Sequence, residues 1–222
     1  DFCLSRGLGD VYKRQAERTG QLLMVGFNRR HAPLYQQLKE LFPDQRAGQC
    51  RLLKTRLRGG RPQSPAEAVW DDVIHQIDLS RWLMGDPQQV HAAFQCGPHG
   101  EFAGLNVLFQ YADGRSTTLT HAICAGGVQE RVELYGDGVS AWVDNLEVFQ
   151  TQQEGVTETR TFDPWSVTLT KRGFTSAHEH FLECLRHGRP SAQSVQDALK
   201  SHELAQTILD VAGVEQLPVT RT

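Results

Sequence analysis

The residues best suited to chemistry lie in one octet, DDVIHQID at residues 71–78. On a helix, side chains three and four positions apart are neighbours, so Asp71 is expected beside His75 and His75 beside Asp78. An imidazole next to a carboxylate can transfer protons near neutral pH, because the carboxylate orients the ring and stabilises its charged form. The octet therefore predicts a proton-transfer pair, although a histidine beside acids is also a common structural hydrogen-bonding residue.

A metal site is a second interpretation of the octet, because Asp and His are common ligands and helical spacing can place two of them on one ion. The other histidines lie far away in the sequence, and the chain has no HExxH motif and no paired cysteines. With no second source of ligands in the sequence, we expect no metal.

The octet must sit on a helix, and the sequence indicates one over residues 71–84. Apolar positions such as Ile74 and Ile77 would anchor this helix in a core, and the Gly-Asp-Pro of residues 85–87 would end it. Upstream, the pattern predicts a helix over 34–42, a strand over 49–57 and a Gly/Pro/Ser-rich loop over 59–65. Downstream, β-rich runs separated by turns fill 89–162, and helical spacing returns at 174–186 and 195–211.

This order of elements predicts an α+β fold in which a mostly antiparallel open sheet carries helices on one face. The start of the chain differs. Residues 16–19 followed by Gly20 indicate the last turn of a helix, and the apolar run 22–27 is typical of a strand buried on both faces of a parallel sheet. A helix end followed by a buried strand is half of a βαβ unit, which we interpret as the end of a truncated Rossmann domain.

Composition excludes several classes of protein. The 222 residues carry a formal charge of −3 with dispersed Lys and Arg, so we expect no nucleic-acid partner. No apolar run is long enough to span a bilayer, and five scattered cysteines favour reduced thiols and a cytoplasmic location. The basic stretch over residues 54–61 is most simply a solvated loop, or else it binds an anionic substrate or a cofactor phosphate.

Three blocks of the sequence resemble the Gfo/Idh/MocA oxidoreductases: VGFNRR at 25–30, the octet with the WLMG that follows it at 82–85, and FLEC at 181–184. Within that family the chain is most similar to the MviM-like branch of proteins described as virulence factors. Markers of the branch are APLY at 32–35 after FNRR, the doubled aspartate, and KRGF at 171–174. The resemblance extends from Ala16 to the C-terminus.

The resemblance implies a two-domain enzyme, with an N-terminal Rossmann domain that binds NAD or NADP and a C-terminal domain that supplies the substrate pocket. Such enzymes oxidise a hydroxyl of a carbohydrate-like small molecule by hydride transfer, and often form homo-oligomers through the open sheet. By position in the family motifs, Asp71 and His75 would be catalytic, and Asn28 and Arg29 would contact the cofactor. Asp78 would be structural.

Two family features are not found in this sequence: it has neither a GxGxxG fingerprint nor the lysine of a Glu/Asp-Lys-Pro motif. Residues 1–15 do not match the family and are typical of a gene-model artefact. We therefore assign 1–15 to a non-family segment, 16–29 to a remnant of the dinucleotide-binding domain and 30–222 to the substrate and oligomerisation domain. The chain would then be a fragment of an NAD(P)-dependent dehydrogenase, inactive alone, or else a non-catalytic binding or dimerisation module of the same fold.

Overall fold

The computed structural model describes residues 18–43, 47–57 and 63–214. Its centre is an eight-stranded sheet in the order β2-β3-β4-β1-β5-β6-β7-β8, in which only the β1–β4 pair is parallel. The strands are β1 (Gln49–Leu57), β2 (Gln89–Cys96), β3 (Phe102–Gln110), β4 (Ser116–Ala125), β5 (Gln129–Gly136), β6 (Val139–Asp144), β7 (Val148–Gln153) and β8 (Val156–Thr161). The predicted open, mostly antiparallel sheet is confirmed.

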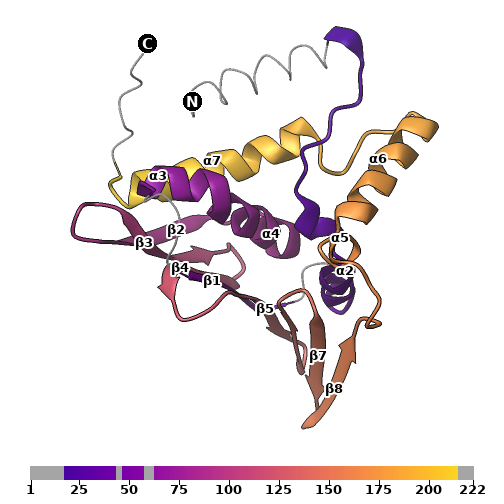
Figure 1. The fold of residues 1–222 in the computed structure, drawn as a ribbon, viewed down its shortest axis with the longest axis horizontal. Helices are drawn as coiled ribbons and strands as arrows, with labels where there is room; N and C mark the ends of the chain where they lie inside the picture. The colour runs from indigo at the N-terminus through magenta and orange to yellow at the C-terminus, as the bar shows by residue number, and fades with distance from the viewer. Residues whose placement is uncertain (1–17, 44–46, 58–62, 215–222) are drawn as a thin grey trace.

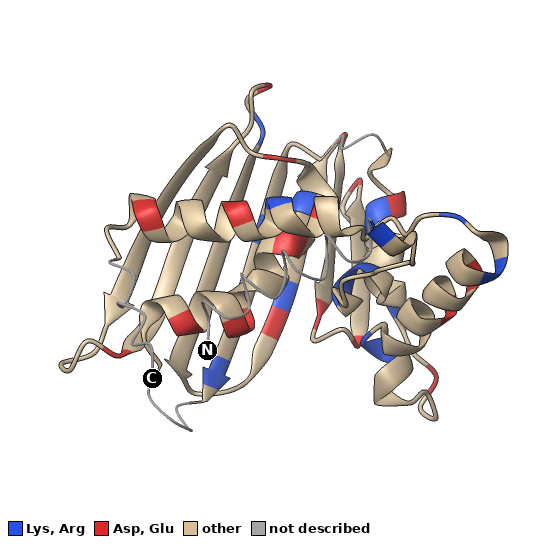
Figure 2. Ribbon diagram, turned by 90° about the horizontal axis from the view of Figure 1, so that it is seen from above, with Lys and Arg blue, Asp and Glu red and all other residues tan. Residues whose placement is uncertain are grey.

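The helices lie over one face of this sheet, as Figures 1 and 2 show, so the predicted α+β layering is also confirmed. They are η1 (Asn28–His31), α2 (Pro33–Glu40), α3 (Pro65–Ala68), η3 (Val69–Val73), α4 (Ile74–Met84), α5 (Thr168–Lys171), α6 (Phe174–His187) and α7 (Val195–Val211). Helix α4 contacts β1 and β4 near the middle of the sheet, whereas α2 packs on β6 and β7.

Side-chain alternation along the two central strands determines what lies beneath α4. In β1 the buried row contains Cys50, Leu52 and Lys54, and in β4 it contains Thr117, Leu119 and His121. Because side chains alternate between the two faces of a strand, these residues all point toward the helices. Lys54 and His121 are partners in the β1–β4 register, so a lysine and a histidine lie side by side in a core row that is otherwise mostly apolar.

The helix that carries the octet is longer and less regular than predicted. It begins at α3, where Ser64 and Glu67 form a capping box that satisfies backbone N–H groups at the start of the helix. It continues through η3, a π-helical turn, into α4. A π-turn adds a residue to the helical turn, so it rotates the side chains that precede α4 relative to ideal α-helical spacing. Of the predicted loop over 59–65, residues 59–62 lie outside the described residues.

The predicted strand over residues 22–27 is wrong, because this segment pairs with no strand among the described residues. Its backbone is tied instead to the loop before α7, where Val25 N–H donates to the Gln193 carbonyl at 3.3 Å. Only Phe27 in the segment is buried. The predicted helix end is found at residues 18–19, followed by Gly20 at φ 65°, while residues 16 and 17 lie outside the described part of the chain.

Gly173 holds η1 against the turn between α5 and α6. It adopts φ 80°, and a Cβ atom at this position would lie 2.3 Å from the Asn28 carbonyl oxygen. The Asn28 side chain also reaches this turn, where its Nδ2 donates to the Arg172 carbonyl at 2.7 Å. The FNRR and KRGF motifs are therefore in direct contact, although they lie far apart in the sequence.

Candidate functional site

Asp72 is the centre of a buried charge cluster between β1, β4 and the π-turn. Lys54 Nζ donates to Asp72 Oδ1, and Arg56 Nε lies 2.7 Å from Asp72 Oδ2. His121 Nε2 lies 3.2 Å from the same Oδ2. Burial by itself would raise the pKa of Asp72, but His121 and Lys54 outweigh it and hold this pKa well below its usual range. Asp72 is therefore ionised at neutral pH and neutralises positive charge inside the core.

His121 is oriented by a second partner on the helix. Its Nδ1 lies 2.7 Å from the side-chain oxygen of Gln76, and Gln76 Nε2 donates to the Thr120 carbonyl at 3.4 Å. Because a carbonyl oxygen only accepts, Nδ1 is the donor of this hydrogen bond. The contacts on the two sides of the ring fix the His121 side chain between α4 and Asp72.

The π-turn changes which aspartate belongs to this cluster. Asp71 was predicted beside His75, but it is exposed, and its Oδ2 accepts from Gln63 Nε2 at 3.1 Å. Asp72 is buried instead and contributes to the electrostatic environment of His75. The expected neighbourhood of Asp71 and His75 assumed ideal α-helical spacing, from which the π-turn over 69–73 departs. A catalytic role for Asp71 stays a prediction.

His75 sits on the first turn of α4, with its ring edge against Phe27 at a centroid distance of 6.1 Å. Its Nδ1 is buried, and no described protein group hydrogen-bonds to it. Burial lowers the pKa of His75, and the positive charges of Arg29 and Lys54 lower it further. The ring is thus kept neutral near physiological pH, which is the form that can accept a proton.

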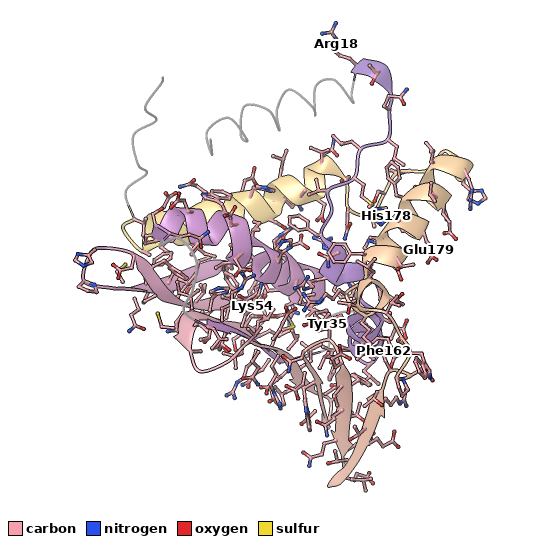
Figure 3. All side chains as sticks on the ribbon, viewed as in Figure 1. Arg18, Tyr35, Lys54, Phe162, His178 and Glu179 are labelled. Carbon is pink, nitrogen blue, oxygen red and sulfur yellow. The ribbon has the colours of Figure 1, made fainter. Side chains whose placement is uncertain are left out.

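The other side of His75 faces a second buried ion pair, formed by Arg29 and Glu130. Arg29 donates from Nε and Nη2 to the two Glu130 oxygens at 2.9 Å each, and Tyr35 donates its hydroxyl to Glu130 Oε1 at 3.0 Å. Burial would raise the pKa of Glu130, but Arg29 lowers it to below its usual value. Figure 3 labels Tyr35 and Lys54 in the region where the helices meet the sheet.

Asp78 belongs to a separate network of hydrogen bonds and ion pairs with residues remote in the sequence. Arg30 donates from Nε to Asp78 Oδ2 at 2.8 Å and from Nη2 to Oδ1 at 2.5 Å. Ser201 on α7 donates to Asp78 Oδ1 at 2.9 Å, and Arg81 Nη1 donates to Ser201 at 2.7 Å. These contacts join η1, α4 and α7 and so hold the helix that carries His75.

Sequence reasoning missed Lys54, Asp72, His121 and Glu130 as site residues. Lys54 could have been predicted, because it follows Cys50 and Leu52 at alternate positions of the predicted strand and should point toward the core with them. His121 lies two positions after Leu119 in the predicted strand and should point to the same face. Nothing in the local sequence indicates that Glu130 would lie near His75, because their proximity arises from the pairing of β1 with β5.

Metal-ligand clusters and membrane-spanning helices are both absent from the described residues. They contain no group of three or more His, Cys, Asp or Glu side chains that could hold an ion. None of the described helices has the length and apolar character needed to cross a bilayer. Figure 2 shows acidic and basic residues interspersed on the helical side of the molecule, without a continuous basic band in that view.

Comparison with known proteins identifies the family of this chain. Residues 35–141 match the GFO/IDH/MocA C-terminal domain. YceM of Salmonella typhimurium is 26% identical over 214 residues, which cover 93% of this chain and 68% of YceM. The chain belongs to the Gfo/Idh/MocA family. Inositol 2-dehydrogenase of Rhizobium meliloti is 24% identical over 217 residues, covering 89% of this chain and 65% of the enzyme.

Two solved structures of oxidoreductases share the fold. The MviM dehydrogenase from Clostridium difficile superposes with a TM-score of 0.82 at 22% identity, covering 88% of this chain and 64% of that protein. An oxidoreductase from Agrobacterium radiobacter, solved with NAD+, L-tartaric acid and magnesium, gives a TM-score of 0.75 at 15% identity over 92% of this chain and 67% of that protein. The chain spans about two thirds of the length of the proteins it matches.

The two residues predicted to bind the family's nicotinamide cofactor are engaged by protein groups. Asn28 is buried and donates to the Arg172 carbonyl, and Arg29 is paired with Glu130. As they are placed, these side chains join η1 to the rest of the domain. A contact of either residue with NAD or NADP therefore stays a prediction.

Proposed function

We propose that this chain is the substrate-side domain of a dehydrogenase that oxidises a hydroxyl of a sugar-like or polyol-like small molecule. The observation that carries the proposal is His75, a half-buried imidazole kept neutral by its surroundings, in a domain of the Gfo/Idh/MocA family. Related proteins named as inositol dehydrogenases support the substrate class. In the longer protein, a nicotinamide cofactor would accept the hydride.

His75 is the group we assign to the proton. Oxidation of an alcohol to a carbonyl removes a hydride from carbon and a proton from oxygen, so a base must lie within hydrogen-bond reach of the hydroxyl. Of the two ring nitrogens, Nδ1 is the buried one, which leaves Nε2 to face the substrate. Lys54 and Arg29 favour the neutral ring before the reaction and thereby keep it ready to accept the proton.

The two aspartates have different roles in this proposal. Asp72 compensates the charge of Lys54 and orients His121, so it maintains the site without contacting substrate. Asp71 is exposed four residues before His75, and its carboxylate keeps accepting capacity beyond the one hydrogen bond from Gln63 Nε2. We therefore keep Asp71 as a substrate-binding candidate and assign the proton transfer to His75.

The test is turnover by the longer protein encoded at the native locus. Reduction of NAD+ or NADP+ would be followed spectrophotometrically with inositols, hexoses and nucleotide sugars as substrates. His75→Ala should lower kcat about 10²–10⁴-fold, as expected for loss of a general base. His178→Ala is the matched control, since His178 is exposed on α6 and its Nδ1 bonds the Phe174 carbonyl of the same helix. Equal turnover in His75→Ala and the parent would refute the assignment.

A cofactor-binding assay should distinguish the present chain from the longer protein. We expect NADH and NADPH to bind the longer protein and to show no measurable binding to the present chain by fluorescence or calorimetry. Tight binding by the present chain would mean that the described residues form a nucleotide site after all, and would contradict this division of roles.

A homo-oligomer formed through the open face of the sheet is part of the proposal. On that face, Arg51 lies over the Tyr135 ring at 5.9 Å, and Arg131 lies over the Trp142 ring at 5.4 Å. Arginine and large aromatic residues are enriched in protein interfaces. Sedimentation should show an oligomer that Trp142→Glu dissociates, and a monomeric parent at micromolar concentration would contradict it.

A further inference from the structure

A small cavity separates His75 from the Arg29–Glu130 pair. It is lined by His75, Arg29, Glu130, Lys54, Gln76 and neighbouring residues of β1 and β5, and it offers about 10 Å³ to the centre of a water molecule. That volume is close to the minimum that one buried water requires. Polar groups border the cavity on several sides, and a buried water needs about 2–4 such partners.

The hydrogen-bonding needs of the lining residues are complementary. His75 Nδ1 is buried without a hydrogen bond from any described protein group. The Lys54 ammonium has further N–H groups beyond the one directed to Asp72, and the Glu130 carboxylate has accepting capacity beyond its bonds to Arg29 and Tyr35. A water in the cavity can accept from Lys54 and from His75 Nδ1–H while it donates to Glu130.

We propose that one water molecule in this cavity links His75 Nδ1 to Glu130, and that Glu130 is thereby the positioning residue that selects the Nδ1–H tautomer of His75. In that tautomer Nε2 carries a lone pair, as a proton acceptor facing the substrate must. Arg29 and Tyr35 then hold Glu130 in place, which gives Arg29 a role through Glu130. The effect of this tautomer on turnover rests on the proposed function, whereas the presence of the tautomer in the chain is independent of that function.

Arg29 and Lys54 also oppose protonation of the linked ring. Burial and these two cations lower the pKa of His75, while Glu130 and Asp72 raise it by smaller amounts. Glu130 is thus placed to orient the neutral ring without making it cationic. This differs from a direct carboxylate–imidazole pair, in which the contact strongly favours the charged form.

The test is the tautomer of His75 in the present chain, measured by long-range ¹H–¹⁵N correlation spectroscopy of the imidazole at about pH 8, where an unperturbed histidine is neutral. His75→Gln assigns the signals among the nine histidines. We expect Nδ1–H as the major tautomer in the parent and its loss as the major form in Glu130→Met. A major Nε2–H tautomer in the parent would overturn the proposal.

A second variant protects the test against misfolding. Glu130→Met leaves Arg29 unpaired, so the double variant Arg29→Met/Glu130→Met removes both charges together, and it too should lose the Nδ1–H tautomer. Glu133→Met is the matched control, because odd and even positions of β5 face opposite sides and Glu133 bonds Arg131 and Tyr135. An unchanged tautomer in the double variant would overturn the proposal.

The water can be sought directly in a crystal structure of the chain. Density within hydrogen-bond distance of both His75 Nδ1 and Glu130 supports the proposal, and a dry cavity contradicts it. None of these measurements requires turnover. If the longer protein is inactive but His75 has the Nδ1–H tautomer, only the proposed function is refuted. If the longer protein is active but His75 has the Nε2–H tautomer, only the role of Glu130 is refuted.

Discussion

Replacing Asp72 by Asn should destabilise the domain far more than the small difference between the two side chains suggests. The Lys54 side chain is 8% exposed and the His121 side chain 0%, so neither can turn toward water when the carboxylate is lost. Leaving one member of a buried ion pair without its partner costs about 3–5 kcal/mol. Arg56 is 51% exposed, and its pair with Asp72 adds at most about 1 kcal/mol because water screens it.

The assay is equilibrium unfolding in urea, followed by circular dichroism and by the fluorescence of the four tryptophans. For a domain of this size, a loss of about 3–5 kcal/mol corresponds to a decrease in Tm of roughly 6–20 °C. Asp71→Asn is the matched control, since the neighbouring aspartate is exposed, and we expect a change within about 0.5 kcal/mol. The double variant Lys54→Met/Asp72→Asn should recover part of the loss, because no cation is then stranded at position 54.

The pH dependence provides an independent check on the same residue. The pKa of Asp72 is lower in the folded state than in the unfolded chain, so its contribution is present above the unfolded pKa and is lost as the pH falls toward the folded value. The difference in unfolding free energy between Asp72→Asn and the parent should therefore be constant near neutral pH and shrink below about pH 4. Equal, small effects of Asp72→Asn and Asp71→Asn would refute the placement of Asp72 in the core.

Three further predictions concern local structure. Ser64→Ala removes the capping box and should cost about 1 kcal/mol in urea unfolding, an effect that a stable Ser64→Asp variant should not show. Gly173→Ala should cost about 2 kcal/mol or more, because the new Cβ meets the Asn28 carbonyl and the residue has positive φ; a Tm equal to that of the parent would contradict this contact. His75→Gln should weaken the dependence of the unfolding free energy on pH. Because the pKa of His75 is lower in the folded state than in the unfolded chain, the parent loses stability as the pH falls below about 6.5. The same pH dependence in His75→Gln and the parent would exclude a lowered pKa of His75.

The sequence predicted the sheet and most helices well because their signals are local. The strand over 49–57 and the helix after Pro33 follow directly from apolar spacing and proline placement, and both occur where predicted. The run 22–27 was mistaken for a buried strand because composition alone does not supply the neighbouring strands that a sheet requires. In the structure it is an unpaired segment that carries Phe27 to the ring of His75.

The candidate site was predicted only in part because it depends on a helical irregularity and on strand pairing. The octet indicated His75, but the buried aspartate of the π-turn is Asp72, whereas Asp71 is exposed. The basic stretch over 54–61 was interpreted mainly as a solvated loop, although Lys54 is in fact buried in β1. Its place beside His121 follows from the parallel β1–β4 register, which short-range periodicity does not reveal.

The energetic cost of the buried charges favours a functional reason for their presence. A sheet that packs against α4 needs only apolar residues in the rows of Leu52 and Leu119, and well-packed apolar replacements of a buried ion pair are often neutral or stabilising. Lys54, Asp72 and His121 therefore do not make the domain more stable than an apolar core would. What Lys54 does contribute is a positive charge near His75 that adds to burial in lowering the pKa of the imidazole, and Asp72 offsets this effect only in part. If this is its role, Lys54→Met in the longer protein should move the acidic limb of the pH–rate profile to higher pH, because His75 loses a nearby cation and keeps the carboxylate of Asp72. An unmoved acidic limb would contradict this role.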